Sequence, residues 1–163
     1  MKKTVFLLVL ILISFSITCF AGGFDVNGLG DSDFIIRYVY LQSSEEDAIR
    51  NLGYEYSYSG TASKHTLSYG RLDIDCKYHN ILCMATDDPG DYTYRKIHVG
   101  SSLAEVREKY GENYYAVTSY NNLWLYEYDT YAYGQKDQHW ILRFAVSQKT
   151  NLVFYWSIRN ASL

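Results

Sequence analysis

The residues that could carry out chemistry in this chain are few and scattered. Asp73 and Asp75 alternate along one predicted strand, which places both carboxylates on one face about 7 Å apart. Such a pair could transfer protons or hold a cation, but more often it is the solvated side of a half-exposed strand. The four histidines (positions 65, 79, 98 and 139) show neither HxH nor HxxxH spacing. Without a phosphate loop or a nucleophile elbow, the sequence predicts a non-enzyme that needs no metal or cofactor.

Two cysteines form the other candidate site. Cys76 and Cys83 flank a predicted hairpin that turns at His79-Asn80, so we expect the two thiols to face each other. In an exported protein a facing pair forms a disulfide where the local geometry permits. The alternative is that both remain reduced and pack as small hydrophobic side chains. Zinc is disfavoured because the CxxC spacing is missing.

The N-terminal segment predicts export. Residues 1–21 combine Lys2 and Lys3 with an apolar run and small residues before Gly22, as in a signal peptide. The run is shorter than the ~20 residues of a membrane-spanning helix. We therefore expect the protein in the periplasm, in the cell envelope or outside the cell. The alternative is lipidation at Cys19, which would anchor the chain to a membrane.

The composition narrows the class of partner. Without the first 21 residues the chain carries 13 basic and 18 acidic residues, and no basic run occurs. This balance argues against nucleic acid and anionic lipid as partners, so membrane contact is expected only if Cys19 is lipidated. The hydrophobic content of 48% is ample for a core, and the 18 tyrosines suit half-buried sheet faces and binding surfaces.

The chain repeats itself. Residues 33–53 and 91–111 align without a gap, 58 positions apart, and five pairs are identical: Asp33/Asp91, Arg37/Arg95, Ser43/Ser101, Ser44/Ser102 and Gly53/Gly111. A match of this length at a fixed offset predicts two copies of one supersecondary unit. After the signal peptide at 1–21, we expect a first αβ repeat at 22–90 and a second at 91–163, with the break at residues 87–90.

Each copy predicts a short helix followed by strands. The helices, at 43–52 and 101–110, begin at a capping serine with Glu three residues later and end at glycine. Alternating apolar residues predict strands at 54–58, 65–69, 71–76 and 81–86, then at 114–120, 123–128, 139–146 and 152–159. The fold class is α+β: two tandem helix-plus-four-strand repeats forming one roughly eight-stranded antiparallel sheet, with short helices on one face.

The sheet face turned away from the helices is the predicted binding surface, and the register of the last strand determines its content. An even-length loop pairs Val146 with Val153 and exposes Phe154, Trp156 and Ile158 beside Arg143. An odd-length loop pairs Val146 with Leu152 and buries the aromatic residues instead, because a slip of one residue exchanges the two faces.

The motif IHVGSSLAEVREKYG, at residues 97–111, resembles the repeat of the β-lactamase inhibitor protein family. A similar unit occurs in the small lipoprotein of the outer-membrane β-barrel assembly machine. The resemblance implies a free concave sheet face that presents aromatic and basic side chains to a protein. Mapped onto this chain, these are Arg143, Phe154, Trp156 and Ile158. The chain departs from the family at Gln42, where the family has Gly, and in its cysteines, which lie in a hairpin.

These observations favour an exported, non-catalytic protein-binding module. We expect a monomer that engages a protein partner of unknown identity through its free concave face, and inhibition of an enzyme is one form this binding could take. One alternative is an envelope lipoprotein that scaffolds an assembly. Another is a small-ligand binder that uses two tyrosine-rich strands, residues 54–58 and the strand holding Trp124 and Tyr126.

Overall fold

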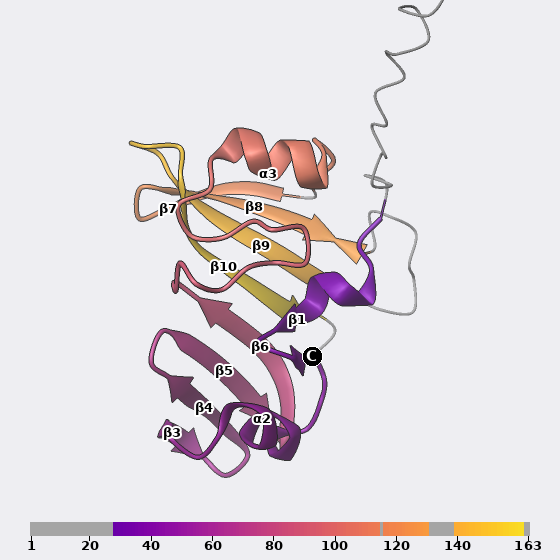
Figure 1. Ribbon diagram of the computed structural model, residues 1–163, viewed down its shortest axis with the longest axis vertical. Coiled ribbons are helices and arrows are strands. Elements are labelled where there is room, and N and C mark those ends of the chain that lie inside the picture. Colours follow the sequence, from indigo (N-terminus) through magenta and orange to yellow (C-terminus); the bar gives the residue numbers. More distant parts are fainter. Residues whose placement is uncertain (1–27, 115, 131–138, 162–163) are drawn as a thin grey trace, which may run out of the picture.

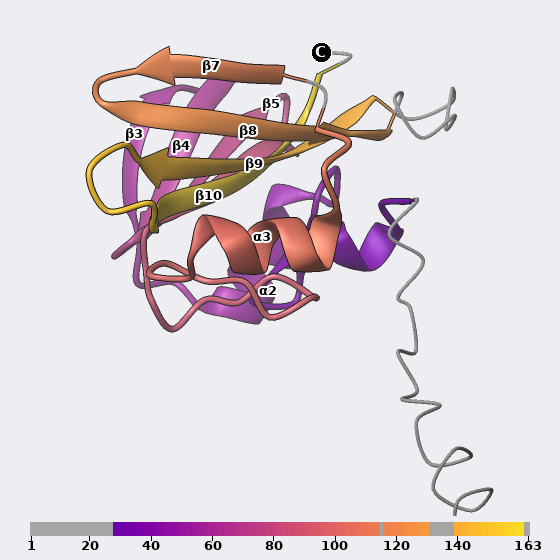
Figure 2. The same ribbon diagram turned by 90° about the horizontal axis from the view of Figure 1, so that it is seen from above.

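The computed structural model describes residues 28–114, 116–130 and 139–161. The predicted signal peptide and Cys19 lie outside the described residues. The fold is α+β, as predicted: a large antiparallel sheet has the strand order β3-β4-β5-β6-β10-β9-β8-β7, and a separate hairpin pairs β1 with β2. Figure 2 shows helices α2 and α3 on the same side of the large sheet. We call this side the helix face and the opposite side the free face.

The N-terminal half begins with a 3-10 helix, η1 (Asp31–Phe34), and the hairpin β1 (Ile35–Ile36) and β2 (Val39–Tyr40). Helix α2 (Glu45–Leu52) follows, and then the antiparallel strands β3 (Ser57–Thr61), β4 (Lys64–Tyr69), β5 (Leu72–Lys77) and β6 (Asn80–Thr86). The C-terminal half contains α3 (Leu103–Tyr110), β7 (Ala116–Tyr120), β8 (Leu123–Asp129), β9 (Trp140–Ser147) and β10 (Val153–Asn160). The last strands of the two halves, β6 and β10, pair in the middle of the sheet (Figure 1).

Both helices start and stop at the residues that cap them. The Ser44 side chain accepts a hydrogen bond from the backbone N–H of Asp47, and Ser102 accepts one from Glu105. Gly53 and Gly111 end the helices with φ values of 93° and 80°, a region that favours glycine. The first cap differs by one residue from the expected Ser43. In the described residues no helix is long and apolar enough to cross a membrane.

The core lies between the helices and the sheet. Tyr110 of α3 places its ring 5.3 Å from that of Phe144 on β9 and 5.5 Å from that of Tyr128 on β8. The Tyr128 hydroxyl donates to the carbonyl of Gly111, at the end of α3. In the N-terminal half Tyr69 does the same to Gly53. One tyrosine from the sheet therefore satisfies the last free carbonyl of each helix.

Two details of the first half differ from expectation. The strand predicted at 54–58 is shifted, because pairing with β4 begins at Ser57 and the turn falls at residues 62–63. The β1–β2 hairpin was not predicted. Its strands are too short to show alternation, and its turn is formed by Arg37 and Tyr38 at positive φ, without the Asn-Gly pair that usually marks such a turn.

A β-bulge interrupts the final strand of each half. On β6, Ile81 pairs with Cys76 and Cys83 with Asp75, which leaves Leu82 as the extra residue. On β10, Val153 pairs with Val146 and Tyr155 with Ala145, which leaves Phe154 as the extra residue. Because side chains alternate between faces along a strand, one extra residue reverses the facing of every residue beyond it.

Candidate functional site

The bulge at Phe154 determines which aromatic side chains the free face presents. Val146 pairs with Val153, as in the even-loop register, but the bulge then turns Trp156 and Ile158 back to the helix face. Both side chains are 0% exposed. The prediction that Trp156 and Ile158 lie on the free binding face is therefore wrong. Val146 pairs with Val153 as in the even-loop register, but the bulge at Phe154 buries Trp156 and Ile158 as the odd-loop register would.

The remaining predicted binding residues are dispersed. Phe154 is exposed (58%) at the bulge, whereas Trp124 and Tyr126 pair with helix-face residues Val146 and Phe144. Tyr126 is buried, and only Trp124 is partly accessible. The two tyrosine-rich segments proposed for a small ligand also lie apart, since β3 is one edge of the sheet and β8 is next to the other edge.

The free face carries a cluster of paired charges on β8, β9 and β10. Arg143 lies on it, as predicted, and its Nε donates to Glu127 Oε1 at 2.6 Å. Arg159 approaches the same carboxylate at 3.5 Å. Cross-strand pairing lines up one row of side chains across the face: Asp73, Ala85, Ser157, Arg143 and Glu127. This row contains no aromatic anchor of the kind that dominates protein interfaces, whereas the next row on the same face pairs Leu125, Ala145 and Tyr155.

A β-bulge also places the two cysteines on opposite faces of the sheet. Cys76 is buried on the helix face, in alternation with Leu72 and Ile74, whereas Cys83 pairs with the exposed Asp75 on the free face. Both cysteines are free thiols. The predicted Cys76–Cys83 disulfide is therefore absent, because the bulge at Leu82 sends the two side chains to opposite faces of one sheet.

Thiol labelling should confirm this arrangement. After unfolding without reductant, an alkylating reagent should label both Cys76 and Cys83, and the Cys83→Ser variant should take one label fewer than the wild type. In the folded protein at pH 8 both should react slowly, because burial raises the thiol pKa of Cys83 to about 11 and that of Cys76 to about 12. Mass spectrometry measures the number of labels. An unfolded wild-type chain in which neither Cys76 nor Cys83 takes a label before reduction would contradict the structure.

The candidate acid–base residues are engaged locally. Asp73 and Asp75 lie on the exposed side of β5, as expected, and accept hydrogen bonds of 2.6 Å from the hydroxyls of Ser68 and Thr66. Among the described residues no group of three histidine, cysteine or carboxylate side chains is arranged to hold a metal ion.

Glu45 gathers two of the histidines at the start of α2. Its Oε2 lies 2.8 Å from His79 Nδ1, and its Oε1 makes an ion-pair contact of 3.1 Å with His65 Nε2. Burial alone would raise the pKa of the Glu45 carboxyl, but the contacts with His79 and His65 outweigh it and the pKa is lowered. This cluster ties α2 to the neighbouring strands, which is a structural role.

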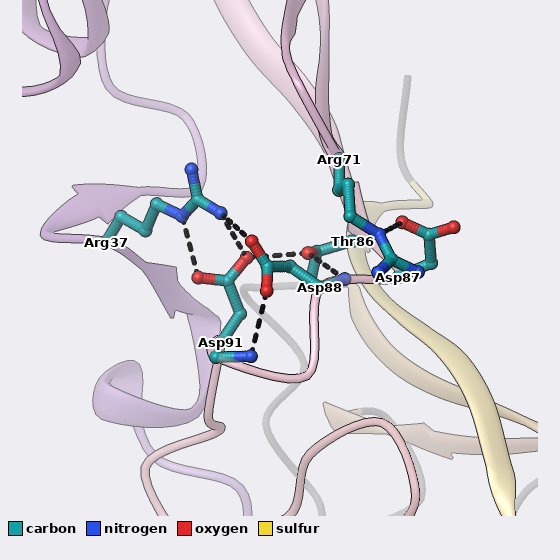
Figure 3. A network of polar contacts seen from close by, with 7 residues as sticks. Arg37, Arg71, Thr86, Asp87, Asp88 and Asp91 are labelled. Carbon is teal, nitrogen blue, oxygen red and sulfur yellow. Dashed lines mark hydrogen bonds and ion pairs between the residues drawn. The ribbon is translucent and has the colours of Figure 1, made fainter.

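Two ion pairs join the halves of the chain on the helix face. Arg37 donates through Nε to Asp91 Oδ1 (2.7 Å) and through Nη2 to Asp91 Oδ2 (3.0 Å) and to Asp88 (2.9 Å). Thr86 donates its hydroxyl to Asp91 as well (2.6 Å). Figure 3 shows Arg37 facing both carboxylates, with one terminal nitrogen that contacts none of the residues drawn. The hydrogen bond to Asp91 raises the pKa of Arg37.

The second ion pair is more deeply buried. Arg95 donates through Nε and Nη2 to the two carboxylate oxygens of Asp33, at 3.2 and 3.1 Å. The Tyr110 hydroxyl donates to the same carboxylate at 3.1 Å. The Arg95 side chain is 8% exposed, whereas that of Arg37 is 31% exposed. Burial, and then the charge of Asp33, raise the pKa of Tyr110 well above its ordinary value.

The two ion pairs are formed by residues at matching positions of the two self-matching segments. Arg37 and Asp33 belong to the first segment of the self-match, and Arg95 and Asp91 occupy the same positions in the second. Each arginine binds the aspartate of the other segment. A contact of residue i with j′ that is matched by a contact of i′ with j is the pattern of a two-fold interface.

A groove of about 760 Å³ opens over these ion pairs. Residues of the β1–β2 turn, of the segment 90–96 and of the end of α3 line it. Three exposed tyrosines stand in its wall: Tyr38, Tyr92 and Tyr94. Lys96 and Lys109 add positive charge. No site was predicted here. Arg37, Asp91 and Arg95 stand among the identical residues of the self-match, but no local pattern indicates that the three lining segments come together.

Comparison with known proteins identifies a likeness in fold. No protein-family model matches the chain, and no curated protein matches it in sequence. In structure it is similar to an extracellular protein containing an SCP domain from Bacillus anthracis, with a TM-score of 0.54 and 7% sequence identity. The match covers 74% of this chain and 44% of the other, so the likeness concerns the fold alone. The resemblance to the β-lactamase inhibitor protein repeat stays a prediction.

Proposed function

We propose that this protein is an exported, non-catalytic binding module that engages another protein through the tyrosine-lined groove on its helix face. The groove supports this better than the free face does. Tyr38 is 85% exposed, and Tyr92 and Tyr94 are more than half exposed. Exposing the apolar surface of these rings to water is unfavourable. Exposed aromatic side chains that line one groove are candidates for an interaction site, and tyrosine provides large contact area at low entropic cost.

A catalytic role for the groove is disfavoured by the state of its carboxylates. Asp91 accepts hydrogen bonds from Arg37 and Thr86, and Asp33 accepts them from Arg95 and Tyr110. A general base needs a carboxylate oxygen that can accept a proton from a substrate within hydrogen-bond reach. These carboxylates are instead held by guanidinium groups, and we assign them a structural role.

The proposal includes the duplicated architecture. Three observations favour two copies of one αβ unit about a pseudo-two-fold axis: the exchanged ion pairs, the matching helix caps and the paired bulges. The bulges correspond because each follows a residue bonded to the loop before the helix. Ile81 donates to the carbonyl of Ser43 (3.0 Å), and Val153 donates to that of Ser101 (2.8 Å). The groove lies between the proposed copies, and sites between domains are frequent places for ligands.

Export is part of the proposal and is supported by two observations. The N-terminal 21 residues have the layout of a signal peptide. The structural neighbour is an extracellular protein. Free thiols do not argue against export here, because the two side chains lie on opposite faces and cannot meet.

A site-specific crosslinking experiment tests the binding site. A photoreactive phenylalanine at position 94 should crosslink a partner in the native envelope or medium, and the same residue at position 120 should not. Tyr94 and Tyr120 are 60% and 64% exposed, so the two positions are matched in accessibility. The Tyr38→Ala/Tyr92→Ala background should reduce the crosslink at position 94 at least tenfold. Equal crosslinking from both positions would contradict the groove as the binding site.

A further inference from the structure

Two histidines and a glutamate meet at the N-terminal end of α2, and we call them the histidine cluster. The side chain of His65, on β4, is only 1% exposed, whereas that of His79, in the turn between β5 and β6, is 76% exposed. Glu45, the first residue of α2, lies between the two rings and is itself largely buried. A buried imidazole is costly unless both of its nitrogens have suitable partners.

Both ring nitrogens of His65 face oxygen atoms that accept hydrogen bonds. Nδ1 lies 3.2 Å from the carbonyl oxygen of Thr61, and Nε2 lies 3.1 Å from Glu45 Oε1. A neutral imidazole has one N–H and would turn a lone pair toward one of these oxygens, whereas the imidazolium has two N–H groups. Nε2 is buried and makes no regular hydrogen bond within the described residues, so its contact with Glu45 stabilises through charge. This geometry suits the protonated ring.

The Glu45 carboxylate supplies the negative charge over the range in which imidazole titrates. Burial raises the pKa of Glu45, but the contacts with His79 and His65 outweigh burial and the pKa is lowered. A free imidazole titrates at about pH 6.5. From mildly acidic to mildly basic pH the carboxylate therefore stays ionised while the histidines change charge. A proton that the folded cluster holds more tightly than the unfolded chain stabilises the fold at low pH, and this gain is lost as the pH rises.

The other groups around the buried ring contribute no charge in this range. The Tyr58 ring of β3 stacks on it with centroids 4.7 Å apart. Cys76 pairs with it from β5, and burial raises the pKa of that thiol to about 12. On α2, Glu46 and Asp47 make ion pairs with Arg50. The histidine cluster itself therefore carries the charge change.

The corresponding place in the second half of the chain contains no titratable side chain. Matching hydrogen bonds relate Glu45, His65 and His79 to Leu103, Trp124 and Asn151. The N–H of the first helical residue donates to the carbonyl of the strand turn in both halves, at 2.9 Å. The N-terminal end of α3 is therefore attached without an imidazole, which makes α3 an internal reference for α2.

We propose that the histidine cluster is a proton-dependent anchor for α2. With His65 protonated, Glu45 ties the start of the helix to β4. At higher pH this attraction is lost and the helix opens more often. The anchor also bears on the groove, because the Asn51 side chain of α2 donates to the carbonyl of Tyr38 in the β1–β2 turn (3.1 Å). The proposal itself does not depend on what the groove binds.

Amide hydrogen exchange of the full chain, read by NMR, tests the anchor. Protection factors, corrected for the intrinsic exchange rate at each pH, are compared for α2 and α3 at pH 5.5 and pH 8. On lowering the pH, the protection of α2 should rise at least threefold relative to that of α3. Glu45→Gln, which removes the charge and keeps the shape, should abolish this rise. An unchanged ratio in the wild type would overturn the proposal, and that measurement does not depend on the folding of any variant.

Two variants serve as controls. Glu46→Gln removes the same charge from the same helical turn, but Glu46 is exposed and contacts Arg50, so the rise should persist. His79→Asn introduces the residue type of Asn151 at a position with positive φ in both halves, and at least half of the rise should remain. If His79→Asn abolished the rise, the proton would reside on the exposed ring and the role given to His65 would be wrong. Loss of the rise in Glu46→Gln would indicate a general charge effect and would also overturn the proposal.

Discussion

The Asp33→Asn variant should lose about 3–5 kcal/mol of unfolding free energy, the usual cost of removing one partner from a buried ion pair. Asp33 is 2% exposed, and the substitution leaves the positive charge of Arg95 uncompensated in a site of low exposure. The Tyr110 hydroxyl loses its charged acceptor at the same time. Urea denaturation at neutral pH measures the loss, and equal m-values would show that the wild type and the variant unfold in the same way.

The equivalent residue in the other half provides the comparison. Asp91→Asn should cost clearly less than Asp33→Asn, because Arg37 is more exposed than Arg95 and keeps Asp88 as a second acceptor. The double variant Asp33→Asn/Arg95→Met should recover part of the loss, since it removes the orphaned charge. If Asp91→Asn were the more destabilising change, burial of the guanidinium would not determine the cost.

Trp156→Ala should destabilise the protein by about 3–5 kcal/mol, the range for removing a buried aromatic side chain. Trp156 pairs with Phe144 on β9 and with Thr86 on β6, so its side chain fills the helix face at the centre of the sheet, where the two halves meet. The expected fall in melting temperature is roughly 10 °C. A thermal melt followed by circular dichroism measures it.

Phe154→Ala is the matched control. Phe154 is an aromatic residue two positions earlier on the same strand, but the bulge leaves it exposed. Its removal should change stability by no more than about 0.5 kcal/mol, as for most surface substitutions. If Phe154→Ala were the more damaging of the two, the bulge would lie elsewhere and Trp156 would return to the free face.

Local signals were sufficient to predict the two helices and the eight strands of the large sheet along the chain. A helix cap acts within one turn, so Ser102, Glu105 and Gly111 predicted the bounds of α3, and the capping box is present in the structure. Alternation along β5 predicted that Leu72, Ile74 and Cys76 face one way and Asp73 and Asp75 the other. The short β1–β2 hairpin had no such signal, since two residues cannot display a period.

The register of β10 could not be predicted from the sequence. Loop parity distinguishes the pairing of Val146 with Val153 from its pairing with Leu152, and either pairing predicts the faces of later residues only where the strand continues regularly. A bulge costs little and leaves the alternation of residues 154–158 unchanged in the sequence. Its position is selected by the burial of Trp156 against Phe144, which is a contact with another strand.

The sequence by itself determined the fold class, the two helices and the succession along the chain of the eight strands of the large sheet, because caps and alternation depend on neighbours a few residues away. Only the tertiary structure decided which faces Trp156 and Cys83 occupy and where the charges meet. Arg37, Lys96 and Lys109 form no basic run, yet the packing of α3 beside the β1–β2 turn places them around one groove. Contacts between distant segments create that groove, so no local pattern could indicate it.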